Sequence, residues 1–134
     1  MESKQFIEAY FSLLENGIVP LVLNPSIPQK KIEEMAINQG AAKLLVDDGQ
    51  ITLNGSSRSS CAGHILCSSG TSSDNPKSYF FSFPSPLKNA QAHNKSLAIT
   101  KGMRCLFPLP LTHSFGVVVG LWASLDLELE MYIP

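Results

Sequence analysis

A serine-rich segment that ends in a lysine is the part of this sequence best suited to chemistry. It spans residues 68–78 and reads Ser-Ser-Gly-Thr-Ser-Ser-Asp-Asn-Pro-Lys-Ser. Hydroxyl groups, the backbone N–H groups around Gly70 and the ammonium of Lys77 are all donors that phosphate oxygens accept. The Gly-x4-Gly-Lys-Ser/Thr order of a Walker loop is absent from this segment. The segment therefore predicts either a phosphate site of another kind or an exposed polar loop.

Two apolar runs flank this segment, and we predict that both are strands. They are Gly63–Cys67 and Tyr79–Phe83, each rich in β-branched, aromatic or other apolar residues. Residues 63–83 are then a hairpin with the serine-rich segment as its loop. Pro76 is the only apolar side chain in that loop. We expect it to be the most mobile ordered loop when no nucleotide is bound.

Histidines and cysteines give weaker indications. His113 precedes an apolar helix, where it could contribute to catalysis or simply complete a local hydrogen bond. His64 lies between Cys61 and Cys67, but a fourth zinc ligand is missing, so no metal site is predicted. We expect His64 and His93 to be surface or strand residues.

Composition limits the classes of function. The chain has 134 residues, enough for one domain, with 16% charged residues and a net charge of -1. A basic face for nucleic acid is therefore not expected. The longest apolar run, residues 115–125, is shorter than the roughly 20 residues that span a bilayer. An odd number of cysteines and the absence of an evident secretory signal favour reduced thiols and a cytoplasmic location.

Predicted helices and strands alternate along the chain. Helical spacing or start signals occur at residues 6–14, 26–39, 85–102 and 115–125. Short apolar or alternating runs predict strands at residues 18–23, 43–46, 50–53, 104–111 and 127–133, besides the two of the hairpin. The alternation predicts an α/β fold with an open layered sheet and flanking helices.

The order of residues 68–77 resembles the phosphate-binding signature of the adenylate-forming (AMP-binding) superfamily. That superfamily includes acyl-CoA synthetases, luciferases and the adenylation domains of peptide synthetases, and the usual signature is Thr/Ser-Ser-Gly-Thr/Ser-Thr-Gly-x-Pro-Lys-Gly. Residues 109–116, Leu-Pro-Leu-Thr-His-Ser-Phe-Gly, are similar to its Leu-Pro-x-x-His-x-x-Gly stretch. Residues 15–25 are similar to its helix end, glycine and strand ending in Asn-Pro. The loop departs from the signature by one extra residue and by Ser73-Asp74 and Ser78 in place of two glycines.

The resemblance implies a fold, an activity and a set of site residues. Residues 1–134 would be a single partial domain from the large N-terminal domain of an acyl-CoA synthetase-like ligase. Such an enzyme activates a carboxylic acid with ATP and Mg²⁺ to an acyl-adenylate, then transfers the acyl group to CoA or a carrier-protein thiol. His113 would line the acyl-adenylate pocket. The phosphates would be held by Ser68, Ser69, Gly70, Thr71, Ser72, Ser73 and Lys77.

The later motifs of the family have no counterpart in the chain. These are the Tyr-Gly-x-Thr-Glu stretch, the ribose-binding aspartate and the small domain with its catalytic lysine. We therefore expect a truncated or split piece that is inactive alone and that self-associates or needs a complementary polypeptide. The alternative is a non-catalytic remnant that acts through protein contacts.

Overall fold

Helices and short strands alternate in the computed structural model, which describes residues 3–56, 61–67 and 77–134. In chain order the elements are α1 (Ser3–Glu15), β1 (Leu21–Val22), α2 (Gln29–Asn38), β2 (Lys43–Val46), β3 (Gly49–Thr52), β4 (Gly63–Cys67), β5 (Ser78–Ser82), α3 (Ser85–Ser96), β6 (Arg104–Leu106), the π-helical segment η1 (Gly116–Trp122), α4 (Ala123–Asp126) and β7 (Glu130–Tyr132). The predicted α/β class is confirmed.

The described strands are divided among three small sheets. The largest has the order β1-β4-β5, in which β1 is parallel and β5 antiparallel to β4. The pair β2–β3 is antiparallel, and the pair β6–β7 is parallel. The strand β4, which leads into the serine-rich segment, is thus the central strand of its sheet.

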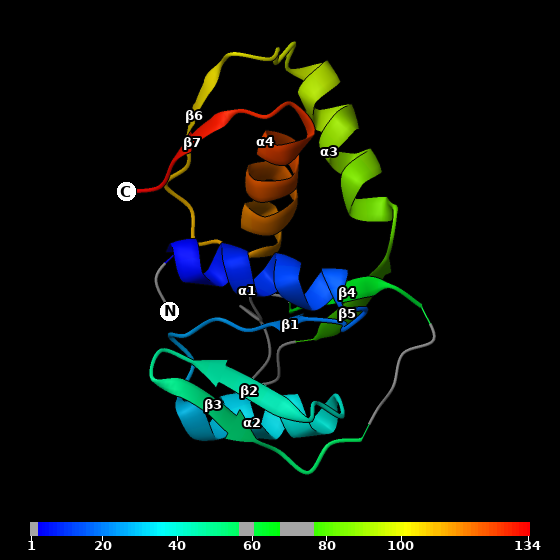
Figure 1. Cartoon of the computed structure of the whole chain (residues 1–134), viewed down its shortest axis with the longest axis vertical. Coiled ribbons are helices and arrows are strands. Elements are labelled where there is room, and N and C mark those ends of the chain that lie inside the picture. The colour runs from blue at the N-terminus through cyan, green and yellow to red at the C-terminus, as the bar shows by residue number, and fades with distance from the viewer. Residues whose placement is uncertain (1–2, 57–60, 68–76) are drawn as a thin grey trace.

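Helix α1 organises the core. Phe6, Tyr10 and Leu14 recur at a spacing of four residues, which places them on one face of the helix. Figure 1 shows α1 in the middle of the molecule, with β1, β4 and β5 on one side and β6, β7 and α4 on the other. The buried cluster comprises Tyr10, Val22, Leu66, Phe107, Leu111, Val117 and Leu121. The core therefore joins the hairpin sheet to the C-terminal third of the chain.

The hairpin β2–β3 forms where the sequence predicts it. Residues Asp47 and Asp48 make the turn, and Gly49 follows with a φ of 137°, a value that residues with a side chain rarely adopt. Figure 1 shows this hairpin beside α2, at the end of the molecule away from α3. This part of the fold lies apart from the main core.

The C-terminal helix differs from a regular α-helix. The predicted helix over residues 115–125 is present, but residues Gly116–Trp122 are wound as a π-helix before α4 continues it. Helix α3 packs against both segments. Buried Asn94 donates one hydrogen bond to the carbonyl oxygen of Ala123 at 2.9 Å and another to Asp126 at 3.1 Å. These bonds fix the angle between α3 and the C-terminal helix.

The last strand is shorter than its alternating sequence predicts. Only Glu130–Tyr132 pair with β6, because the chain turns at Glu128, whose φ is 52°. None of the helices formed by the described residues has the length and apolar character needed to cross a membrane.

Candidate functional site

The strands β4 and β5 pair as the predicted hairpin. Their antiparallel register runs from Gly63 opposite Ser82 to Cys67 opposite Ser78. At the open end of the ladder, Cys67 Sγ and Ser78 Oγ lie 3.4 Å apart. The predicted pairing of the two strands is therefore confirmed, with the second strand one residue earlier than expected. Six of the predicted phosphate ligands lie outside the described residues, together with the loop whose mobility we predicted: Ser68, Ser69, Gly70, Thr71, Ser72 and Ser73.

Lys77 is the predicted phosphate ligand that the structure does describe. It is exposed and directly precedes β5. Cys67, the last residue of β4, is opposite Ser78, the first residue of β5. Lys77 therefore lies at the end of the hairpin that the serine-rich segment connects. A lysine here can present its ammonium to an anion bound by that segment.

His113 lies at the entry to the C-terminal helix. Its backbone carbonyl accepts the N–H of Val117 at 3.0 Å, and its Nδ1 accepts the N–H of Phe115 at 3.2 Å. The side chain is exposed. Of the two alternatives that the sequence allowed for His113, the local hydrogen bond is therefore present. The other ring nitrogen, Nε2, belongs to this exposed side chain and is available for a substrate. A role in catalysis stays a prediction.

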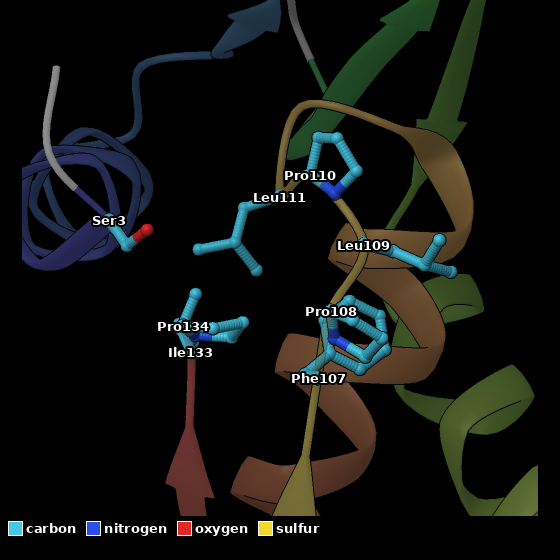
Figure 2. A pocket seen from close by; sticks show the side chains of 8 residues that line it. All are labelled: Ser3, Phe107, Pro108, Leu109, Pro110, Leu111, Ile133 and Pro134. Atoms are coloured by element: carbon cyan, nitrogen blue, oxygen red, sulfur yellow. The ribbon is translucent and has the colours of Figure 1, made fainter.

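The segment just before His113 in the sequence lines a pocket of about 220 Å³. Figure 2 shows its wall from the segment Phe107–Leu111, with Ser3 across the opening and the chain end at Ile133 and Pro134 below. Its side chains are apolar apart from the hydroxyl of Ser3, and backbone polar groups contribute to its lining as well. His113 is not one of the residues that line it.

A buried polar cluster that the sequence did not predict joins three elements. The hydroxyl of Tyr10 in α1 lies 2.5 Å from Nδ1 of His64 in β4, and Nε1 of Trp122 in η1 donates to the same hydroxyl at 3.0 Å. The indole nitrogen can only donate, so the Tyr10 hydroxyl accepts that bond, and its second hydrogen bond is to Nδ1 of His64. Which of these two groups donates depends on the tautomer of the imidazole. No described residue hydrogen-bonds to Nε2 of His64.

Burial shifts the pKa values in this cluster. His64 is 0% exposed, and desolvation lowers its pKa from 6.5 to about 4. Desolvation raises the pKa of Tyr10 to about 12, against a smaller lowering by the bond from Trp122. The rings of Phe81 and Phe83 lie 5.8 and 6.0 Å from the His64 ring. His64 is a strand residue, which is one of the two positions expected for it, and it is fully buried. Its position in an apolar run was the only sequence signal of burial.

The cysteines near His64 do not gather around it. Cys61 is exposed and Cys67 is half-buried beside Ser78. Within residues 3–56, 61–67 and 77–134, no group of three His, Cys, Asp or Glu side chains could hold a metal ion. His93 is a half-buried helix residue of α3, so neither the strand nor the surface position expected for it is found.

Comparison with known proteins gives matches by structure only. No model of a known protein family matches the sequence, and no curated protein matches it. Among solved structures, ATP-bound MatB from Rhodopseudomonas palustris is similar with a TM-score of 0.79 and 17% identity, over 99% of this chain and 33% of that one. The o-succinylbenzoate CoA synthetase MenE from Bacillus subtilis, in complex with the acyl-adenylate intermediate OSB-AMP, has a TM-score of 0.78 and 17% identity, over 99% of this chain and 41% of that one. The same enzyme in complex with ATP and a magnesium ion has a TM-score of 0.74 and 17% identity, over 97% of this chain and 40% of that one.

These matches confirm the fold that the sequence resemblance implies. Nearly all of the chain superimposes on part of these structures, at an identity that establishes the fold alone. The chain spans about a third of the length of the MatB structure it matches.

Proposed function

We propose that this chain supplies the phosphate-binding part of a ligase that activates a carboxylic acid with ATP. The observation that carries the proposal is the β4–β5 hairpin, which joins the two ends of the serine-rich segment at Cys67 and Ser78 and places Lys77 beside them. The fold also supports it, because it is that of part of MatB, solved with ATP, and of part of the o-succinylbenzoate CoA synthetase MenE, solved with an acyl-adenylate.

Each site residue has a distinct role in this proposal. The hydroxyl and N–H groups of residues 68–73 bind the β- and γ-phosphates, and Lys77 adds a charge-assisted hydrogen bond. His113 lines the acyl-adenylate pocket through its free Nε2. The described residues offer no carboxylate cluster for magnesium, so the ion would be held mainly by the phosphates of ATP, as Mg²⁺ commonly is. Bound there, magnesium would neutralise charge on the phosphates.

We propose that a complementary polypeptide carries the ribose-binding and catalytic groups, and that the acyl group passes to CoA or a carrier-protein thiol. A cytoplasmic location would suit the reduced cysteines Cys61, Cys67 and Cys105.

The second candidate is a non-catalytic module that acts through protein contacts. The observation that favours it is the exposed aromatic surface of β5, where Tyr79, Phe80 and Phe81 are 50%, 45% and 39% exposed. A chain of this kind would fold and bind a protein without binding ATP. Nucleotide titration separates the two candidates.

Replacing Lys77 with alanine is expected to weaken binding of ATP–Mg²⁺ by at least about tenfold. A hydrogen bond to a charged group contributes roughly 1.5–3 kcal/mol, and each 1.4 kcal/mol is a factor of ten in Kd. Isothermal titration calorimetry measures the change. Lys88→Ala removes an exposed lysine from α3 and is expected to leave the Kd unchanged. Equal affinities of Lys77→Ala and the unaltered chain would contradict the assigned role of Lys77.

The chain alone is expected to form no acyl-adenylate, because the ribose-binding aspartate and catalytic lysine of the family have no counterpart here. Pyrophosphate release is measured with ATP, Mg²⁺ and a panel of carboxylic acids. Release that disappears in Lys77→Ala would show that the chain is active by itself.

A further inference from the structure

The outer edge of β5 is open and lined by aromatic side chains. Among the described residues no strand pairs with this edge, since β5 ends the order β1-β4-β5. Tyr79, Phe80 and Phe81 are 50%, 45% and 39% exposed. An edge strand with exposed aromatic residues is a template for pairing with another strand.

The direction of the backbone groups along β5 follows from one hydrogen bond. The N–H of Phe83 donates to the carbonyl oxygen of Ala62 at 3.1 Å, on the β4 side. In an antiparallel strand, the residues whose N–H and C=O groups face one neighbour alternate with those that face the other. Tyr79 and Phe81 therefore bond toward β4, as Phe83 does. The N–H and C=O groups of Ser78, Phe80 and Ser82 point to the open edge.

The sequence of β5 is close to a palindrome. It reads Ser-Tyr-Phe-Phe-Ser, with Phe80 at the centre. We propose that two copies of this chain associate by antiparallel pairing of β5 with β5, about a two-fold axis at Phe80. Phe80 then pairs with Phe80 of the second copy, and Ser78 pairs with Ser82. In this register, the residues whose N–H and C=O groups point to the open edge are the ones that form hydrogen-bonded pairs with the second copy. The two three-stranded sheets become one continuous sheet.

Charge and side-chain contacts agree with this register. Tyr79 meets Phe81 of the second copy, and aromatic cross-strand pairs stabilise a sheet. Lys77, the only charged residue next to the strand, lies opposite Phe83 and not opposite the other Lys77. The two lysines are about 20 Å apart along the paired strands at roughly 3.4 Å per residue, beyond the Debye length of about 8 Å in physiological salt. Self-pairing therefore brings no like charges together.

The contact area predicts weak, concentration-dependent association. An aromatic side chain offers roughly 200 Å², so the three half-exposed rings supply about 270 Å² on each copy. Stable complexes bury roughly 600–1,000 Å² per partner. The strand backbone and the two serines add to the rings, but the total stays below this range. We expect a dissociation constant in roughly the micromolar range or above. This inference does not depend on nucleotide binding.

Sedimentation equilibrium with variants at Phe80 tests the register. The unaltered chain is expected to shift from a single-chain mass of 14.6 kDa toward twice that value as its concentration rises. Phe80→Lys places two ammonium groups opposite each other at the axis, and Phe80→Glu places two carboxylates there. Each variant alone is expected to stay monomeric. An equimolar mixture is expected to associate at least tenfold more tightly than either variant, because the axis then joins opposite charges.

Controls separate loss of pairing from loss of folding. Leu97→Lys adds the same charge at a residue that is 62% exposed and lies after α3; it is expected to dimerise as the unaltered chain does. Amide hydrogen exchange of the unaltered chain gives a test without any substitution, since exchange at Phe80 is expected to slow as concentration rises. A monomer at every concentration, a mass that continues beyond two chains, or a mixture no tighter than the separate variants would each overturn the proposal. A monomer would leave the edge to a different protein.

Discussion

Acidification from pH 7 to pH 4 is expected to lower the free energy of unfolding by about 3 kcal/mol through His64 alone. In the folded chain the imidazole is fully buried and its pKa is lowered from 6.5 to about 4. Each unit of pKa difference between folded and unfolded chain corresponds to roughly 1.4 kcal/mol. Phe81 and Phe83 lie against the ring, and the Tyr10 hydroxyl occupies Nδ1 through a hydrogen bond. No described carboxylate hydrogen-bonds to the imidazole.

The sign follows from which state binds the proton. Between pH 6.5 and pH 4 the unfolded chain protonates His64 while the folded chain keeps it neutral, so protons favour unfolding. The contribution of His64 to stability is fully present above pH 6.5. It falls with decreasing pH and is lost at about pH 4. Below that value both states are protonated and the contribution no longer changes.

Urea denaturation at pH 7 and pH 4 measures this effect when the unaltered chain is compared with His64→Gln. The glutamine keeps a side-chain acceptor for the Tyr10 hydroxyl but does not titrate. Carboxylates that titrate in both proteins cancel in the comparison. The unaltered chain is expected to lose about 3 kcal/mol more than His64→Gln. His113→Gln, which changes an exposed histidine, is the control. If His64→Gln kept the full pH dependence, His64 would not be its source.

The parts of the fold that depend on neighbouring residues could be predicted from the sequence. The hairpin β2–β3 follows from two apolar runs joined by Asp47-Asp48-Gly49, and β4–β5 follows from two apolar runs around a polar segment. In each case the turn residues and the strand pattern lie within one short stretch. The overall fold was predicted from the resemblance of residues 68–77 and 109–116 to the adenylate-forming enzymes, and the solved structures confirm it.

Features that depend on distant residues could not be predicted. The partners Tyr10 and His64 are 54 residues apart, and Tyr10 and Trp122 are 112 apart. Periodicity along the chain carries no information about such a meeting. The parallel pair β1–β4 likewise joins strands that are not consecutive, and the parallel pair β6–β7 joins strands separated by η1 and α4. His64 therefore gave the appearance of an isolated polar residue, although it is at the centre of the contact between α1, β4 and η1.

In the helix η1, contacts with residues outside the helix restrict which side chains fit at two of its positions. Gly116 and Gly120 lie in an apolar stretch where helix propensity alone favours alanine. At Gly116 an added Cβ would overlap the carbonyl oxygen of Pro110. At Gly120 it would lie 2.6–2.8 Å from three ring carbons of Phe107. Both contacts come from the segment that precedes the helix and lines the pocket in Figure 2. The glycines allow that segment to lie directly on the helix backbone.

Gly120→Ala is accordingly expected to destabilise the fold by about 2–3 kcal/mol, as crowded core substitutions do. In a helix free of tertiary contacts, the same change would stabilise by roughly 0.5–1 kcal/mol, so the sign of the effect is itself diagnostic. Gly120 and Phe107 are both buried, so a methyl group at position 120 can be accommodated only if the ring shifts. Urea denaturation at neutral pH measures the change in the free energy of unfolding.

A double-mutant cycle with Phe107→Leu identifies the cause of that loss. Leucine is smaller and more flexible than phenylalanine, so it can turn away from a new methyl group at position 120. Phe107→Leu alone is expected to destabilise the core, but Gly120→Ala is then expected to cost at least about 1 kcal/mol less than it does in the unaltered chain, because contacting residues couple by roughly 0.5–3 kcal/mol. Strict additivity of the two substitutions would mean that the ring of Phe107 is not what excludes a side chain from position 120. The coupling energy thus measures how tightly the segment before His113 packs against η1. Since His113 lies at the start of the same helix, this packing also helps to fix its position.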